Sequence, residues 1–434
     1  MKHISLIILV IWTGFLVGCG SSGNSDFIGR LDLSGAQSLA IASAGGVGTR
    51  GISTSSAGDR TLLLKLDIDG NIEEVTHYDD NNRETRAPNP LEVRNIDDDW
   101  IALFYSEWNT LSQASSADHA YIVQKSTGNA YSLPRGMHVV RNVDGFSQST
   151  NGQLFVRLQD TSNWDAGVHL YRIQPGTTPT ATRISIAVDN VGDWYSPGSH
   201  SIPAFAVAND GTVIYNSNST NGNWSDPRTR LIFPNGSGFT LSSNQSFFWS
   251  APDGNIYWYN DSKIVTPELN GTSINNVVYS KLPDDTWIDG WGTQLIRTPN
   301  RIIGVDTGSG EILELFRTDL NGAVLNKAQL TNSNSWSWNA VSDTAWIGDK
   351  IIFLVSGNLI PFNPTTFEVE DKITPSETFE FYSIQPFSDT EVLFSGLRNI
   401  DSAMITGTIN VGNGSITVST ANTSFEVVQL ERIN

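Results

Sequence analysis

The sequence predicts an all-β protein that folds as a β-propeller, and three observations favour this class. Apolar residues fall in runs of four to seven that are rich in β-branched and aromatic side chains, and no convincing long amphipathic helix follows residue 26. Tight Asn-Gly and Asp-Gly turns separate these runs along the chain. The turns recur every 40 to 60 residues, which is the length of one four-stranded propeller blade.

The composition bounds the class of protein. The 434 residues are 39% hydrophobic, 16% charged and 10% aromatic, which is neither a disordered profile nor that of a coiled coil. The formal net charge is −19, from 26 basic and 45 acidic residues, so we expect no nucleic-acid partner and no electrostatic attraction to anionic membrane surfaces. A single Cys excludes a disulfide within the chain.

The first residues have the features of an export signal. Lys2 supplies a positive charge, and Ile4 to Val17 form an apolar stretch that is short for a membrane span. The stretch ends in Leu16-Val17-Gly18-Cys19, which contains the chain's only Cys. An ordinary secretory signal with a coincidental Cys is the alternative interpretation of this segment.

Leu16-Val17-Gly18-Cys19 resembles the lipobox of bacterial lipoproteins. The resemblance implies that residues 1–18 are a removable signal peptide and that the Cys19 thiol carries lipid, including palmitate, which anchors the protein to a membrane. Gly20 rather than Asp follows the Cys, which by the sorting rule of this family implies the outer membrane, with the periplasmic or surface leaflet left open. The expected organisation is then a tether at 19–27, rich in Gly and Ser, and a single propeller domain at 28–434.

Two classes of turn alternate along the chain. The first class precedes a short apolar strand and is clearest at Asn151-Gly152, Asp210-Gly211 and Asp253-Gly254. Weaker copies lie at Asp98-Asp99, Pro299-Asn300, Gly348-Asp349 and Asp389-Thr390. The second class lies at Asp69-Gly70, Thr127-Gly128, Pro175-Gly176, Asn235-Gly236, Asn270-Gly271, Asn321-Gly322, Asn363-Pro364 and Asn413-Gly414. Each unit therefore has the order strand, tight turn, strand, longer loop, strand, tight turn, strand.

Seven complete units and a partial N-terminal one favour eight blades of four antiparallel strands, with seven blades as the alternative and an array of β-sandwiches as a third possibility. The first unit has three good strands, at Leu39 to Ala42, Leu62 to Leu66 and Ile72 to Thr76. The run from Phe425 to Leu430 is a spare strand that would complete this blade and close the ring, leaving no free sheet edge.

The topology sorts the loops between the two faces of the disc. Both tight turns of a blade fall on one face, and the longer middle loops and the connections between blades fall on the other. Trp108, Trp164 and Trp224 lie in the middle loops of three consecutive units, among Asn, Asp and Ser neighbours. Further tryptophans lie in or beside the connections between units, at Trp194, Trp287, Trp291, Trp336 and Trp338.

Trp rings beside amide and carboxylate groups suit stacking on sugars and also suit protein interfaces. The candidate ligand-binding residues are Trp108, Trp164, Trp194, Trp224, Trp287 and Trp291. Packing of each ring against the next blade is the alternative interpretation.

No catalytic residue is identified. Gly-x-Ser-x-Gly, His-Glu-x-x-His and the Asp-box of sialidase propellers do not occur, and the histidines of the mature chain have no ligand spacing. Carboxylates on the loop-bearing face could form the pair that a glycosidase needs: Glu107, Asp165, Asp193, Asp226, Asp285 and Asp289. We expect no metal or cofactor. Asp67 to Asn71 and Asp319 to Gly322 resemble calcium loops faintly but lack the downstream bidentate Glu.

A lipobox followed by a propeller of about eight blades is similar to the scaffold lipoprotein of the outer-membrane β-barrel assembly machine and to other pyrroloquinoline-quinone-like propellers. Val305-Asp306-Thr307-Gly308 and Ser126-Thr127-Gly128 resemble part of that repeat, whereas its terminal Trp is missing from nearly every unit.

The resemblance implies a lipid-anchored envelope protein. From it and from the Trp-rich loops we expect a non-enzymatic binding or scaffold module for a protein or glycan ligand. An envelope or extracellular carbohydrate-active enzyme that uses loop carboxylates is the alternative.

Overall fold

A computed structural model describes much of the chain. The described residues are 27–43, 61–68, 71–85, 89–106, 119–134, 136–140, 147–160, 167–186, 189–191, 204–219, 228–242, 248–250, 254, 256–260, 263–269, 274–281, 295–298, 301–306, 314–318, 324–330, 341–355, 357–375, 378–401, 403–418 and 426–434. Their regular secondary structure is entirely β-strand, and within these ranges no helix is long and apolar enough to cross a membrane.

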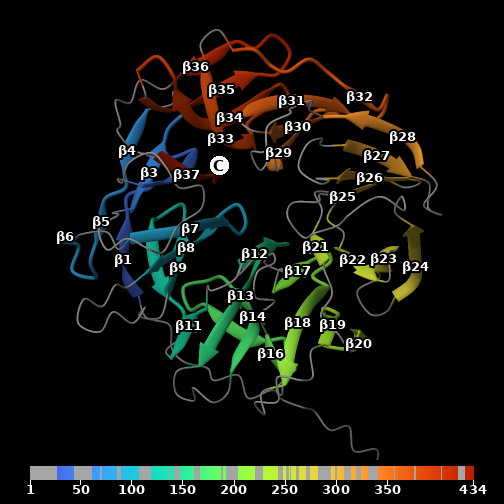
Figure 1. The fold of residues 1–434 in the computed structure, drawn as a ribbon. Helices are drawn as coiled ribbons and strands as arrows, with labels where there is room; N and C mark the ends of the chain where they lie inside the picture. The colour runs from blue at the N-terminus through green and yellow to red at the C-terminus, as the bar shows by residue number, and fades with distance from the viewer. Residues whose placement is uncertain are drawn as a thin grey trace, which may run out of the picture.

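The described strands form antiparallel sheets that are arranged in a ring, so the protein is a β-propeller (Figure 1). Five sheets have four strands each. The first contains β37 (Glu426–Arg432), β2 (Ser38–Ser43), β3 (Thr61–Leu66) and β4 (Ile72–Glu74). The second contains β21 (Phe248–Ser250), β22 (Ile256–Asn260), β23 (Lys263–Leu269) and β24 (Ile274–Lys281). The third contains β25 (Leu295–Thr298), β26 (Arg301–Asp306), β27 (Glu314–Thr318) and β28 (Val324–Gln329). The fourth contains β29 (Val341–Ile347), β30 (Lys350–Val355), β31 (Asn358–Asn363) and β32 (Glu368–Val369). The fifth contains β33 (Phe379–Pro386), β34 (Glu391–Arg398), β35 (Ala403–Asn410) and β36 (Ile416–Val418).

Two sheets have five strands because two short strands share one neighbour. In one, β11 (Met137–Val139) and β12 (Ser147–Thr150) both pair with β13 (Gln153–Asp160), which is followed by β14 (Val168–Gln174) and β15 (Thr180–Arg183). In the other, β16 (Asp189–Val191) and β17 (Phe205–Val207) both pair with β18 (Val213–Ser219), which is followed by β19 (Arg228–Ile232) and β20 (Gly238–Ser242).

The remaining sheet has seven strands. Its four-stranded part is β7 (Asn89–Asn95), β8 (Trp100–Ser106), β9 (His119–Gln124) and β10 (Asn129–Ser132). Its outer edge is extended by β1 (Phe27–Leu31), β5 (His77–Tyr78) and β6 (Glu84–Thr85).

The sequence predicts eight blades of four strands each, with seven as the alternative, and the described sheets correct this expectation because not all of them have four strands. Five described sheets have the four-stranded form and three are larger. The physical reason is twofold: the first-strand position is divided between two short strands in two sheets, and the N-terminal segment adds strands to a third.

The C-terminal strand closes the ring as the sequence predicts. β37 pairs antiparallel with β2, from Ser38 with Arg432 to Ser43 with Glu426, so strands from both ends of the chain form one sheet. Figure 1 shows β37 inside the ring, between β33 and β7. This arrangement leaves β2 paired on both sides.

Two of the predicted tight turns, at Asn151-Gly152 and Gly348-Asp349, are two-residue hairpin turns in the structure. Thr150 pairs with Gln153, and the two residues between them, Asn151 and Gly152, have φ angles of 51° and 68°. Such angles define the two-residue hairpin turn that Asn-Gly favours. The end of the ring that carries these turns is called the hairpin end below, and the opposite end, which carries the middle loops and the connections between blades, is called the loop end.

The hydrophobic core lies between neighbouring sheets. One cluster joins Phe104 and Ile122 of the seven-stranded sheet to Val156 and Leu158 of the next sheet. Another joins Leu354 of β30 to Phe394 of β34. Among the described side chains, apolar packing between neighbouring sheets therefore helps to hold the ring together.

Candidate functional site

The strand of each sheet that lies nearest the centre of the ring is called its first strand here; β37, β7, β12, β17 and β33 are examples (Figure 1). Side chains on several first strands bind the backbone of the first strand of the next sheet. Gln429 on β37 accepts a hydrogen bond from the Val93 N–H at 3.0 Å and donates one to the Val93 carbonyl at 2.7 Å. Gln148 on β12 likewise accepts from the Val207 N–H at 2.9 Å and donates to the Phe205 carbonyl at 3.3 Å. Each glutamine thus satisfies backbone groups on an edge strand that has no further strand beside it.

A glutamine also links two first strands where the ring closes, between β33 and β37. Gln385 on β33 accepts from the Arg432 N–H at 2.8 Å and donates to the Leu430 carbonyl. In the reverse direction, Ser149 on β12 donates to the Asn95 carbonyl at 2.6 Å. These side chains link consecutive first strands by hydrogen bonds in addition to the apolar core.

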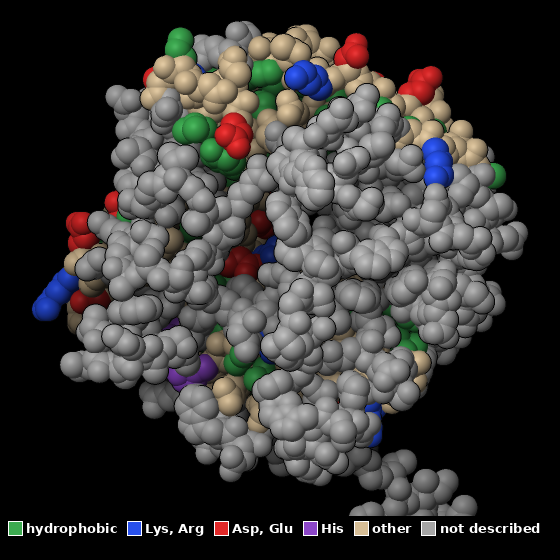
Figure 2. All heavy atoms as spheres, in the orientation of Figure 1, with side chains coloured by type: hydrophobic (Ala, Val, Ile, Leu, Met, Phe, Trp, Pro, Cys, Tyr) green, Lys and Arg blue, Asp and Glu red, His purple; other side chains and the backbone are tan. Residues whose placement is uncertain are grey.

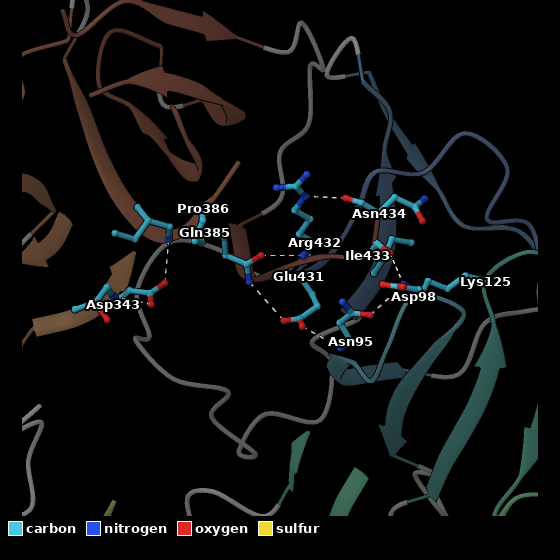
Figure 3. A pocket seen from close by; sticks show the side chains of 12 residues that line it. Asn95, Asp98, Lys125, Asp343, Gln385, Pro386, Glu431, Arg432, Ile433 and Asn434 are labelled. Atoms are coloured by element: carbon cyan, nitrogen blue, oxygen red, sulfur yellow. Dashed lines mark hydrogen bonds between the residues drawn. The ribbon is translucent and has the colours of Figure 1, made fainter. Parts of the chain in front are cut away.

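A pocket of about 820 Å³ lies where β37 meets β33 and β7. Its lining includes Asp98, in the turn between β7 and β8, and Lys125, in the turn between β9 and β10. Pro386, at the end of β33, and Arg432, at the end of β37, complete this side of the lining (Figure 3). All four positions are at strand ends or turns of the hairpin end, so the pocket lies toward that end and not toward the loop end. Acidic and basic side chains are visible at the centre of the ring in the space-filling view (Figure 2).

Two carboxyl groups of the pocket are bound to backbone amides. Asp343 Oδ2 accepts from the Ile384 N–H at 2.9 Å and from the Ser383 hydroxyl at 3.2 Å. Glu431 Oε1 accepts from the Asn95 N–H at 2.9 Å. Burial raises the pKa of both carboxyls, against the opposing effect of these hydrogen bonds.

Lys125 is the basic group on the opposite wall of the pocket. Its Nζ donates to Asn95 Oδ1 at 3.1 Å and to the Ile433 carbonyl, which joins the turn after β9 to the end of the C-terminal strand (Figure 3). Burial lowers the pKa of Lys125, while Asp97, Asp98 and Asp99 oppose the shift. The polar groups of the pocket therefore connect the walls to each other.

The enzyme hypothesis concerns carboxylates of the loop end, which lie outside the described residues, and this pocket holds two further acids. A general acid and a nucleophile or base on opposite sides of a substrate have carboxyl pKa values that are pushed apart. Within the described pocket, Asp343 and Glu431 shift in the same direction and both are held by β-strand amides.

A second buried polar cluster lies in the sheet of β16 to β20. Arg230 Nη2 donates to Asp189 Oδ1 at 3.1 Å, and the Tyr215 hydroxyl donates to Asp189 Oδ2 at 2.9 Å. All three residues are buried. Burial raises the pKa of Tyr215, and the Asp189 charge adds to this shift. Because Asp189 begins β16, this cluster fixes the short strand that precedes the segment 192–203.

The sequence-predicted site residues lie outside the described residues. This applies to Cys19, to the candidate tryptophans Trp108, Trp164, Trp194, Trp224, Trp287 and Trp291, and to the candidate carboxylates Glu107, Asp165, Asp193, Asp226, Asp285 and Asp289. The strands that flank Trp108, Trp164 and Trp224 are described, and they pair antiparallel as the repeat predicts: β8 with β9, β13 with β14 and β18 with β19.

Two histidines that show no ligand spacing in the sequence come together at the loop end. The His119 and His138 rings lie 4.8 Å apart, and the Tyr105 ring stacks on His119 at 5.4 Å. Tyr105 and His119 flank the segment that contains Trp108. This cluster could not be predicted from sequence spacing, because His138 belongs to the next sheet.

The faint calcium loop at Asp67 is explained in part by its turn. Both carboxylate oxygens of Asp67 accept hydrogen bonds from Asn71, at 2.8 Å from its N–H and 2.7 Å from its side-chain amide. Asp319 to Gly322 lie outside the described residues. Among the residues that the structure describes, no three His, Cys, Asp or Glu side chains are grouped so that they could hold a metal ion.

Comparisons with known proteins give likenesses of fold at low identity. No family model and no curated protein matches the chain. The structure of a eukaryotic initiation factor matches with a TM-score of 0.47 and 12% identity over 91% of this chain and 98% of that one. The Dos1 propeller matches with a TM-score of 0.49 and 7% identity over 90% and 97%. Dipeptidyl peptidase 4 of Porphyromonas gingivalis matches with a TM-score of 0.44 and 8% identity over 84% and 58%. At these values the likenesses carry nothing about function, and the propeller class rests on the strand pairing described above.

Proposed function

We propose that the protein is a lipid-anchored propeller of the cell envelope that acts as a non-enzymatic binding or scaffold module for a protein or glycan. In this proposal Cys19 carries the anchor, the location is the outer membrane, and the ligand binds the tryptophans of the loop end. The two five-stranded sheets and the seven-stranded sheet then count as blades with divided or added strands, which makes eight blades.

One observation supports the non-enzymatic interpretation above the enzymatic one. The buried acids of the described pocket, Asp343 and Glu431, accept hydrogen bonds from backbone amides of neighbouring first strands. Carboxyl groups that bind backbone amides in this way stabilise the closed ring. Such a ring is expected of a rigid scaffold whose ligands bind at its surface loops.

Anchoring and binding are tested separately. Cys19→Ser should abolish lipid labelling by radioactive palmitate and move the protein from the membrane fraction to the soluble fraction. Unchanged labelling and fractionation would reject the anchor.

For binding, the mature chain is applied to a glycan array and is also crosslinked to envelope proteins in cells. Capture that is lost in Trp108→Ala, Trp164→Ala and Trp224→Ala supports the proposal, with Trp258→Phe, a change at a buried core ring, as the control. Release of shortened sugars from an array glycan, lost in a variant of a loop carboxylate such as Glu107→Gln, would instead support the carbohydrate-active enzyme.

A further inference from the structure

The first described strand leaves the propeller in a defined direction. β1 pairs antiparallel with β10, with Phe27 opposite Tyr131 and Arg30 opposite Asn129. β10 begins at the hairpin end, directly after the turn that contains Gly128, and runs toward the loop end. Because β1 runs against it, Phe27 lies toward the loop end and Leu31 toward the hairpin end.

Two glycines allow β1 to take this place. A Cβ atom on Gly29 would lie 2.1 Å from the Tyr78 carbonyl oxygen, and one on Gly128 would lie 2.0 Å from the Leu31 carbonyl oxygen. Both contacts are much shorter than van der Waals distance, so these two positions accept no side chain without movement of the backbone. The Leu31 N–H donates to the Gly128 carbonyl at 2.9 Å, and the Phe27 ring packs edge-on against Tyr131 at 5.9 Å.

We infer that the loop end of the propeller is its membrane-proximal surface and that the hairpin end, with the central pocket, points away from the bilayer. The inference rests on the proposed lipid anchor at Cys19. Seven residues separate Cys19 from Phe27, and this length of chain reaches no more than about 29 Å when fully extended. A short tether that leaves the rim at the loop end holds that end near the lipid headgroups.

Two exposed isoleucines provide matched reporter positions. Ile400 is 86% exposed and lies between β34 and β35, at the loop end. Ile68 is 72% exposed and lies between β3 and β4, at the hairpin end. In two variants a fluorescent non-natural amino acid replaces one or the other, and the lipidated protein is incorporated in vesicles of phosphatidylethanolamine and phosphatidylglycerol that contain a headgroup-nitroxide lipid.

We expect quenching at position 400 to be several-fold stronger than at position 68. Equal quenching, or stronger quenching at position 68, would overturn the orientation. A second arm couples Cys19 of the unlipidated mature chain to a maleimide-headgroup lipid in the same vesicles. This coupling anchors the protein independently of lipidation in the cell. If native chains fail to float with vesicles while the coupled chains show the expected quenching difference, the natural anchor is rejected and the orientation set by β1 is retained.

Discussion

Gln429 and Val93 lie 336 positions apart in the sequence, and the side-chain amide of the first binds both backbone groups of the second. Gln429 therefore replaces, for one residue, the strand that would otherwise lie beside β7. Gln148 and Gln385 make related contacts on other first strands, where each binds the N–H of one residue and the carbonyl of the residue two positions before it. The contact of Gln429 is therefore one instance of a recurring arrangement.

Gln429→Ala should destabilise the closed ring. The change leaves the N–H and carbonyl of Val93 without this partner, and an unsatisfied buried backbone group costs about 1–3 kcal/mol, so we expect a loss of about 2 kcal/mol or more in the free energy of unfolding. Denaturant unfolding measures it. Gln174→Ala, at an exposed strand end, is the control and should stay within about 0.5 kcal/mol of the parent. Equal losses in both variants would contradict a special role for Gln429.

Stability should respond to the protonation of Glu431 in a defined direction. Because burial raises the folded-state pKa of this carboxyl, its contribution is fully present below the unfolded pKa and is lost as the pH rises through the folded pKa. Glu431→Gln keeps an oxygen for the Asn95 N–H and removes the buried charge.

The variant should then be at least as stable as the parent at neutral pH, and the difference should disappear toward about pH 4. Thermal unfolding as a function of pH measures this difference. The exposed Glu84→Gln serves as control and should follow the parent at every pH. A Gln variant less stable than the parent at neutral pH would show that the charge itself stabilises the fold.

Removal of the Asp189 carboxylate should be costly. Asp189→Ala leaves the buried Arg230 guanidinium without its anion, which typically costs about 3–5 kcal/mol. Tyr215→Phe removes one donor and should cost only about 1 kcal/mol. Urea unfolding of both variants, with the exposed Asp349→Ala as control, gives the ranking. If Asp189→Ala costs no more than Tyr215→Phe, the ion pair is not the stabilising element.

The three middle-loop tryptophans distinguish recognition from packing. If Trp108, Trp164 and Trp224 are ligand platforms, each Ala variant should keep its melting temperature and lose about 2 kcal/mol or more of binding free energy. A ring buried between blades would instead cost about 3–5 kcal/mol of stability. Thermal unfolding and a binding assay on the same three variants decide, and large losses of melting temperature in all three would leave these rings as packing residues.

The parts of the fold that local chemistry specifies could be predicted from the sequence. Asn151-Gly152 needs two positive φ angles and forms the expected hairpin, and the spare C-terminal run pairs with Ser38 to Ser43 as an open sheet edge requires. The regular spacing of such turns was enough to indicate the ring.

Contacts between distant segments could not be predicted in this way. The edge position of β1 depends on the fit of Gly29 against Tyr78, and the division of two first strands depends on how a neighbouring strand pairs with both pieces. For the pocket, the polar residues Gln148, Gln385, Gln429 and Glu431 were visible on first strands, but their partners belong to other sheets. A search for amide side chains on the first strand of each unit would have found the glutamines that link neighbouring first strands.

The pairing of β37 with β2 also sets the order of events during folding. β2 and β3 are made early, yet the partner that covers the edge of β2 is synthesised after all the other described strands. Until then the nascent protein carries an open strand edge, a template for pairing with other chains, and contacts of such long sequence separation form slowly. Ring closure is thus a late and vulnerable step, at which a chaperone would protect the chain most effectively.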